Sequence, residues 1–223
     1  MLESAPNPDE VFHRLNGLLP EIDARERGVA IRLYQRLAGG VPVAAQEVSS
    51  DLELSTDEVE GILDRWYGVI RDEERRVYGF WGLSLRETKH HFKVDGRRLY
   101  TWCAWDALFI PEILAKPAQI ASTCPVTGQS VRLTVTSRGI EHLEPSGAVM
   151  SLVTPEPARI RDNVVQNFCH FVHFFSAAEA GSSWTAENAG TFLVSLDDAY
   201  VLGKRKNADR FGSSLIPPAA GRG

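Results

Sequence analysis

The stretch that decides the fold is Leu99-Tyr-Thr-Trp-Cys-Ala-Trp-Asp-Ala-Leu-Phe-Ile-Pro111. Its first residues alternate up to Cys103 as in a strand, and residues 105–114 have the character of a helix. Asp106 falls in the first turn of that helix, so a thiol and a carboxyl group are expected close together in apolar surroundings, which shift pKa values. A plain structural interpretation also exists. An aspartate is favoured at a helix start by the helix dipole, and a free cysteine often acts as a small buried hydrophobic residue.

The residues upstream of this stretch predict helices followed by a hairpin. Helical periodicity covers 24–37 and 44–52, and Ser55-Thr-Asp-Glu58 has the pattern of a capping box that opens a further helix. Residues 91–102 predict a β-hairpin on an Asp-Gly turn. Helices followed by such a hairpin indicate a winged helix-turn-helix arrangement. We therefore expect residues 1–85 to form a winged-helix-like helical domain.

The charge of the capped helix argues against DNA binding, although the shape alone favours it. Four acidic residues oppose the single Arg65 between Ser55 and Trp66, and phosphates would repel such a helix. The whole chain of 223 residues has a net charge of −5 and a pI near 5.7. This balance argues against a nucleic-acid partner and against an anionic membrane surface.

Downstream of Pro111 the sequence predicts short strands and few helices. The expected elements are strands over 119–124, 130–136, 148–153, 168–175 and 191–195, one helical turn over 139–143, helices over 157–167 and from residue 183, and a final helix over 196–210. Residues 86–211 should therefore form a mixed α/β domain with short antiparallel strands, which gives an α+β fold class. Residues 212–223 are expected to be a disordered tail.

The compartment is predicted from what the sequence lacks. No apolar run reaches the roughly 18 residues that a membrane helix needs, and the N-terminal residues MLESAPNPDE do not resemble a secretory signal. We expect a cytoplasmic protein without a membrane partner. The three cysteines are far apart and include no Cys-x-x-Cys, so they are predicted to be free thiols.

Two of these cysteines lie outside the opening stretch. Cys124 begins a Cys-Pro-x-Thr-Gly turn that resembles half of a zinc knuckle without its partner, which favours a structural role. Cys169 begins Cys-His-Phe-Val-His173. On a strand, Cys169, Phe171 and His173 would share one face, and one thiol with one imidazole is a weak metal signal.

Taken together, several segments resemble the bacterial organomercurial lyase (alkylmercury lyase) family. The resemblance runs in order from about residue 79 to 176, and its most specific segments are the first and last of those that follow. They are Arg98-Leu-Tyr-Thr-Trp-Cys-Ala-Trp-Asp106, Phe109-Ile-Pro111, Cys124-Pro-Val-Thr-Gly128 and Asn167-Phe-Cys-His-Phe-Val-His-Phe-Phe175. The preceding segment Gly82-Leu-Ser-Leu-Arg-Glu-Thr88 also belongs to the resemblance.

The resemblance implies cleavage of a carbon–mercury bond by protonolysis, without a cofactor. It places the catalytic groups on Cys103, Cys169 and Asp106, which would also hold the Hg(II) product, and a structural role on Cys124. Two departures are visible. Trp105 stands where a smaller aliphatic residue is common and is expected to reshape the pocket, and His170 stands where some members carry a dispensable cysteine.

The residue types suit this chemistry. Mercury is a soft cation, and thiolate is the softest ligand that a protein offers. A second thiolate pushes electron density onto the metal, and a carboxyl group at Asp106 can take the thiol proton and pass it to carbon. Burial among aromatic residues would raise the pKa of this carboxyl. Hg(II) would then pass to small thiols or to mercuric reductase.

Two other classes of protein remain open on the sequence alone. One is a metal-responsive winged-helix transcription regulator that uses the thiols as a sensor. The other is a zinc or copper carrier that uses Cys103, Cys124, Cys169 and His173.

Overall fold

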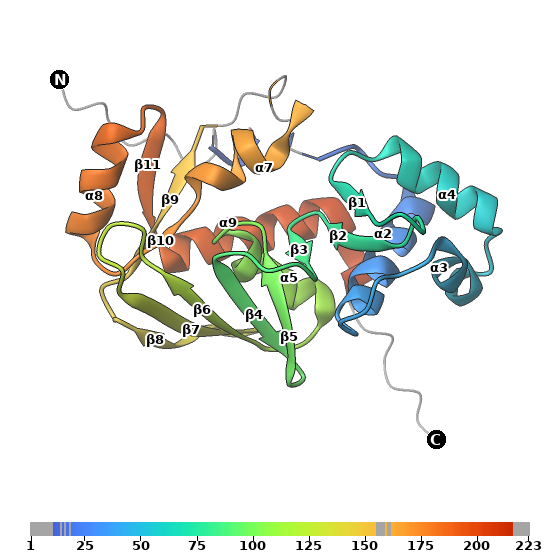
Figure 1. Cartoon of the computed structure of the whole chain (residues 1–223), viewed down its shortest axis with the longest axis horizontal. Coiled ribbons are helices and arrows are strands. Elements are labelled where there is room, and N and C mark those ends of the chain that lie inside the picture. Colours follow the sequence, from blue (N-terminus) through green and yellow to red (C-terminus); the bar gives the residue numbers. More distant parts are fainter. Residues whose placement is uncertain are drawn as a thin grey trace.

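Antiparallel strands form two sheets that organise the molecule (Figure 1). The computed structural model describes residues 11–13, 15, 17, 19–154, 159 and 162–215. The strands in this part of the chain are β1 (Val69–Arg71), β2 (Val77–Phe80), β3 (Leu83–Ser84), β4 (His90–Val94), β5 (Arg97–Thr101), β6 (Ala118–Thr123), β7 (Ser130–Thr136), β8 (Gly139–Glu144), β9 (Val149–Val153), β10 (Phe174–Phe175) and β11 (Thr191–Ser195).

The larger sheet has eight strands in the order β1-β2-β3-β5-β4-β6-β7-β8, and the smaller sheet has the order β10-β9-β11. Every pairing recorded between these strands is antiparallel. The predicted α+β class with short antiparallel strands is therefore confirmed.

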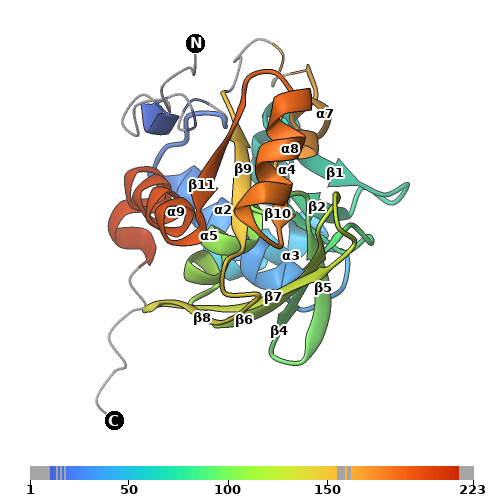
Figure 2. The ribbon, with the colours of Figure 1, turned by 90° about the vertical axis from the view of Figure 1, so that its left-hand side faces the viewer.

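Helices fill the space between the sheets and cover their ends. They are α2 (Ala24–Leu37), α3 (Ala45–Leu52), α4 (Thr56–Arg65), α5 (Asp106–Leu114), α7 (Val164–Asn167), α8 (Ala178–Glu187) and α9 (Leu196–Phe211), with 3-10 helices η1 (Cys169–Phe171) and η2 (Gly212–Leu215). Figure 2 shows α8 lying along the smaller sheet and α9 running beside α5.

The predicted capping box opens α4. The Ser55 Oγ accepts a hydrogen bond from the Glu58 N–H at 3.2 Å, and the Ser55 N–H donates to Glu58 Oε2 at 2.9 Å. This reciprocal pair satisfies two of the amide groups that a helix start leaves free. The predicted bounds of α2 are also those observed.

The predicted hairpin is present as β4 and β5, joined by Asp95 and Gly96. Both residues have positive φ, 48° and 77°, as a type I′ turn requires. This hairpin is an inner part of the larger sheet, because β3 and β6 pair with its two outer edges. It is therefore not a free wing at the surface, and the winged-helix arrangement stays a prediction.

Three local predictions are wrong. Residues 139–143 form strand β8 rather than a helical turn, because Gly139, at a φ of 144°, lets the chain reverse and pair with β7. Residues 168–175 form η1 and only then the short β10, so they are not one strand. Residues 212–215 of the predicted disordered tail form η2. The remaining residues, 216–223, lie outside the described part.

One hydrophobic cluster extends from Val11 to Phe211 and includes side chains from both predicted domains. Strands β1 to β3 also belong to the same sheet as β5. The boundary at residue 85 stays a prediction. At the centre of the cluster lies α5, buried along nearly its whole length and packed against α2, α9 and β7.

Candidate active site

Cys103 lies in the tight connection between β5 and α5. Its side chain is fully buried. The Thr101 hydroxyl donates to the Cys103 carbonyl at 2.9 Å, and the Cys103 N–H donates to Asp106 Oδ2 at 2.9 Å. The carboxylate of Asp106 therefore closes the turn that carries the thiol. The two side chains lie close together in the interior.

Asp106 fits its place because position 82 has no side chain. Gly82 has a φ of 103°, and a Cβ added there would lie 2.4 Å from Asp106 Cγ. The Gly82 carbonyl accepts a hydrogen bond from the Trp102 N–H at 2.8 Å. The turn between β2 and β3 thus forms a close backbone wall behind the carboxylate.

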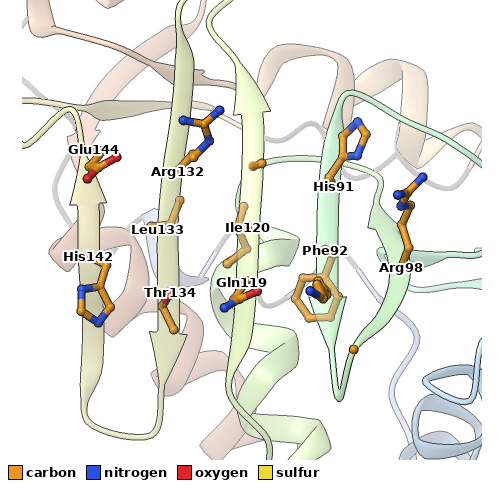
Figure 3. Close-up of a pocket in the computed structure, with 13 residues that line it drawn as sticks. His91, Phe92, Arg98, Gln119, Ile120, Arg132, Leu133, Thr134, His142 and Glu144 are labelled. Atoms are coloured by element: carbon orange, nitrogen blue, oxygen red, sulfur yellow. The ribbon is translucent and has the colours of Figure 1, made fainter.

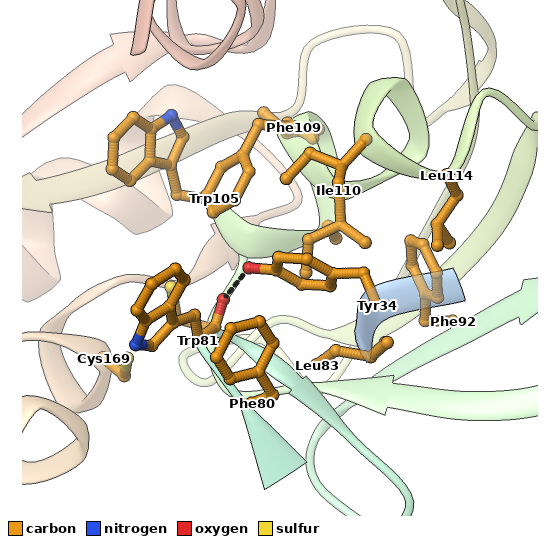
Figure 4. Close-up of a cluster of buried hydrophobic side chains, with 14 of the residues drawn as sticks. Tyr34, Phe80, Trp81, Leu83, Phe92, Trp105, Phe109, Ile110, Leu114 and Cys169 are labelled. Atoms are coloured by element: carbon orange, nitrogen blue, oxygen red, sulfur yellow. Dashed lines mark hydrogen bonds between the residues drawn. The ribbon is translucent and has the colours of Figure 1, made fainter. Parts of the chain in front are cut away.

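The same turn is held from the N-terminal part of the chain. The Tyr34 hydroxyl of α2 donates to the Trp81 carbonyl at 2.7 Å, as Figure 4 shows. Burial, followed by the charge of Asp106, raises the pKa of Tyr34 well above its usual value. The residue that positions the turn therefore also lies near the carboxylate.

Cys169 reaches the site from a 3-10 turn rather than from a strand. The Val172 N–H donates to the Cys169 carbonyl at 3.2 Å, which closes η1. The buried Ser151 of β9 fixes this segment, because its hydroxyl donates to the Phe171 carbonyl at 2.7 Å and accepts from the His173 N–H at 3.0 Å. The face-sharing predicted for Cys169, Phe171 and His173 on a strand is therefore wrong.

A backbone hydrogen bond joins the two thiol segments. The Ala104 N–H donates to the Val172 carbonyl at 3.2 Å. Ligand atoms of Cys103, Asp106 and Cys169 all lie within 4.8 Å of one another, and all three side chains are buried. The structure thus brings together the three residues that the sequence singled out.

Burial dominates the electrostatics of this cluster. It raises the pKa of Asp106 to about 6, against the lowering effects of the Cys103 thiol and of Lys206. Burial, the hydrogen bond with Cys169 and the charge of Asp106 raise the pKa of Cys103 well above its usual value. The hydrogen bond with Cys103 lowers the pKa of Cys169, but burial and the charge of Asp106 raise it overall. All three groups therefore favour their protonated forms more than they would in water.

A pocket of about 280 Å³ opens onto Cys169, whereas Cys103 and Asp106 are not on its wall. Trp102 and the imidazoles of His90, His170 and His173 line it. Burial lowers the pKa of His90 to about 3 and that of His173 to about 4. The lining of this pocket therefore includes an aromatic ring and at least two neutral imidazoles, besides the charged residues Glu87 and Lys89.

Comparisons with known proteins agree with this site. The alkylmercury lyase family model matches residues 83–206, more than half of the chain. The chain belongs to the alkylmercury lyase family. Curated relatives named alkylmercury lyase include one from Streptomyces lividans, 42% identical over 77% of this chain and 78% of its own length. Another, from Staphylococcus epidermidis, is 40% identical over 79% and 80%.

A solved structure has the same fold. It is described as the mercury-bound form of MerB2, and it superposes with a TM-score of 0.74 over 93% of this chain and 99% of its own. At 20% identity this likeness concerns the fold alone. The family match and the buried cluster of two thiols and a carboxyl group together favour the lyase over the two other classes of protein.

The third thiol of this family member lies elsewhere. Cys124 belongs to a separate small cluster with Phe175 and Ala180 and is absent from the group formed by Cys103, Asp106 and Cys169. Burial acts to raise its pKa, but hydrogen bonds from Thr127 and from nearby backbone groups lower it to about 7. Its structural role stays a prediction.

The two alternatives find little support in the described residues. Two acidic side chains of α4 are paired, since Arg71 and Arg75 each contact Glu60 and Asp64 within 3.0 Å, and the helix carries a single basic residue, Arg65. The carrier site predicted from Cys103, Cys124, Cys169 and His173 is not assembled among them.

A larger pocket of about 830 Å³ lies on the outer face of the larger sheet. Figure 3 shows its polar lining on neighbouring strands, with His91, Arg98, Arg132 and His142 among the labelled side chains. None of the three cysteines lines it, so the size of a pocket does not mark the chemistry here.

Trp105 does not line the pocket that reaches Cys169. Its indole N–H donates to the Ala199 carbonyl of α9 at 3.0 Å, and the ring is 2% exposed. The expected effect of Trp105 on the shape of the substrate pocket stays a prediction. The residue fastens α9 to the start of α5.

Sequence reasoning missed Lys206, a buried cation next to this site. Its Nζ lies 3.6 Å from the centroid of the Phe109 ring, and the residue is 4% exposed. A signal was available, because Ala199, Gly203 and Lys206 follow the spacing of the buried face of α9. A lysine on an apolar stripe is unusual.

Within the described part of the chain, no helix is both long and apolar enough to cross a membrane.

Proposed function

We propose that this member of the alkylmercury lyase family cleaves the carbon–mercury bond of organomercurials by protonolysis. The products are a hydrocarbon and Hg(II) held by the chain. The single observation that carries this proposal is the buried group of Cys103, Asp106 and Cys169, whose ligand atoms lie within 4.8 Å of one another.

The two sulfurs bind the metal in succession. One cysteine exchanges its proton for the R–Hg group of a thiol adduct, which releases that thiol. The other thiol then gives its proton to the Asp106 carboxylate as its sulfur–mercury bond forms. The resulting complex has two thiolates on mercury and carries one negative charge, which weakens the carbon–mercury bond.

Asp106 completes the reaction by returning the proton. The carbon–mercury bond breaks, its electron pair forms the new carbon–hydrogen bond, and Asp106 becomes a carboxylate again. A pKa near 6 suits both halves of this transfer near neutral pH, because a carboxyl group of ordinary acidity would hold the proton too weakly.

The chain's own groups supply every part of this reaction. Two thiols bind the metal and a carboxyl group moves the proton, so we infer that no resident cofactor is needed. Hg(II) on two thiolates leaves most readily by exchange with other thiols. We therefore infer that small-molecule thiols, and mercuric reductase as a protein acceptor, collect it in the cytoplasm.

Hydrocarbon release tests the proposal. Phenylmercury incubated with the purified chain and excess small thiol should yield benzene. Cys103→Ser, Cys169→Ser and Asp106→Ala should each reduce that yield to background, because each removes one required group. Cys124→Ser is the matched control and should retain benzene release. A Cys103→Ser protein with normal turnover would contradict the proposal.

A further inference from the structure

Lys206 places a positive charge in the interior of the molecule. The residue lies on α9 and is 4% exposed. Its ammonium group sits over the face of Phe109 at 3.6 Å and lies 5.4 Å from the Trp105 ring. Aromatic faces attract cations, but two rings do not replace the hydration that a buried ammonium loses. A nearby negative charge is needed to offset the cost of burying this ammonium group.

Close contacts between α9 and α5 fix this position. The Asn207 Nδ2 donates to the Phe109 carbonyl and to Glu112 Oε2, each at 2.9 Å. A Cβ added at Gly203 would lie 2.8 Å from Phe109 Cβ. Since α5 begins with Asp106, these contacts set where the ammonium lies relative to the carboxylate.

The groups that can be negative around Lys206 are those of the active site. Among the described residues, the charges that act to keep it protonated are those of Asp106, Cys103 and Cys169. In the opposite direction, Lys206 is the cation whose charge acts on Asp106. Burial, followed by the charge of the neighbouring Arg210, lowers the pKa of Lys206 to about 7 overall.

Arg210, one turn further along α9, has a different setting. Its guanidinium lies 4.3 Å from the centroid of the Trp81 ring and donates to the Pro20 carbonyl at 2.8 Å. Burial lowers the pKa of Arg210 to about 10, against the charges of Tyr34, Tyr67 and Glu26. Lys206 differs from Arg210 because its ammonium group lies against Phe109 of α5, the helix that begins with Asp106.

We propose that Lys206 is a positioning residue for carbon–mercury cleavage, whose ammonium group balances the single negative charge of the buried site. This inference rests on the proposed function. It assigns to α9 a part in the reaction that the two thiols and the carboxyl group do not supply.

The need for such a counter-charge follows from the proton balance. Before the second thiol adds, the negative charge is on the Asp106 carboxylate. When the thiol proton moves to Asp106, the charge moves to the mercury complex with two thiolates and one carbon ligand. When the proton passes to carbon, the charge returns to the carboxylate. The protonated Lys206 stabilises the charge at both locations.

The experiment compares Lys206→Met with Lys204→Met in benzene release from phenylmercury. Methionine keeps the length and apolar stem of lysine but removes the charge. We expect kcat to fall by about tenfold or more. KM should change by less than about twofold, because capture of a neutral thiol adduct does not change the charge of the site. Lys204, two residues away and partly exposed, should give a variant with parental kcat.

Further variants separate charge from packing. Lys206→Arg, which keeps the charge, should recover most of the lost kcat, and Lys206→Gln should behave like Lys206→Met. The melting temperature of Lys206→Met should not fall, because removing a buried ammonium relieves its desolvation. A kcat of Lys206→Met within about twofold of that of Lys204→Met would overturn the inference. So would equal losses in folded Lys206→Arg and Lys206→Met.

Two outcomes separate the proposed function from the role of Lys206. An intact chain that releases no benzene would reject the proposed function and this inference with it. An active parent whose charge-removing variants keep their kcat would reject only the role of Lys206.

Discussion

A missing side chain determines where Asp106 can lie. Gly82 contacts the carboxylate so closely that a Cβ would come within 2.4 Å of both Cγ and Oδ1. Its φ of 103° is also one that residues with a side chain rarely adopt. The two constraints act together on the group that is proposed to carry the proton.

Gly82→Ala should therefore damage both stability and catalysis. We expect the free energy of unfolding to fall by about 1–3 kcal/mol from backbone strain and crowding. Benzene release should fall by about 100-fold, because small displacements of a catalytic group are costly. Chemical denaturation and hydrocarbon release measure the two effects.

Gly96→Ala is the matched control for this prediction. Gly96 also has a positive φ, 77°, but no atom lies within 4 Å of an added Cβ. It should lose about 1 kcal/mol of stability and keep its activity. A Gly82→Ala protein as active as Gly96→Ala would show that Asp106 does not need this wall.

At the level of residues, the sequence predicts which side chains are reactive better than it predicts which residues surround them. Cys103, Asp106 and Cys169 could be found because their residue types and local motifs are distinctive. Gly82 begins one of the segments of the family resemblance, but its role could not be found, since that role depends on Asp106 approaching from another segment. Lys206 could have been suspected from its place on a helical stripe, but its neighbours come from a helix far away in the sequence.

At the level of elements, the contact between α9 and α5 gives the site its shape. Gly203 permits this contact, because its α-carbon lies against Phe109. Gly203→Ala should lower the free energy of unfolding by about 1–3 kcal/mol through crowding. It should also lower benzene release, since α5 carries Asp106. Denaturant midpoints and turnover provide the measurement.

At a second helical glycine, substitution by alanine should raise the free energy of unfolding instead of lowering it. In α4, a Cβ at Gly61 would meet only the flexible Arg65 Nη1, at 3.7 Å. Gly61→Ala should stabilise the chain by about 0.5–1 kcal/mol, because alanine favours a helix more than glycine does. Equal effects at positions 61 and 203 would contradict the close packing of α9 on α5.

The elements that were predicted correctly have local causes. The capping box of α4 and the Asp-Gly turn of the β4–β5 hairpin act within a few residues. The helical turn predicted over residues 139–143 is wrong, because strand β8 forms by pairing with β7 and not through the periodicity of its own residues. Residues 168–175 look like a strand because they are almost wholly apolar, but Ser151 and Ala104 bind their backbone into a bend.

At the level of the whole molecule, the buried carboxyl group makes stability depend on pH. Burial raises the pKa of Asp106 from 3.8 to about 6. Between these values the folded chain keeps a proton that the unfolded chain has lost. The contribution of Asp106 to the free energy of unfolding is therefore highest below about pH 4. It falls as pH rises and reaches its lowest value above about pH 6.

Asp106→Asn removes this dependence. The difference in unfolding free energy between the variant and the parent should grow in favour of the variant by about 3 kcal/mol from pH 4 to pH 7. Urea titrations at intervals across this range measure it. A difference that is constant with pH would show that Asp106 titrates alike in the folded and unfolded chains.

The pocket over Cys169 affects the order in which the two products can leave. Of the three site residues, only Cys169 lies on its wall. If substrate and acceptor share this passage, the hydrocarbon must depart before a collecting thiol can approach the metal. Transfer of Hg(II) to the collecting thiol then cannot begin until the hydrocarbon has left the pocket. A bulky hydrocarbon therefore slows mercury transfer, although it takes no part in that step.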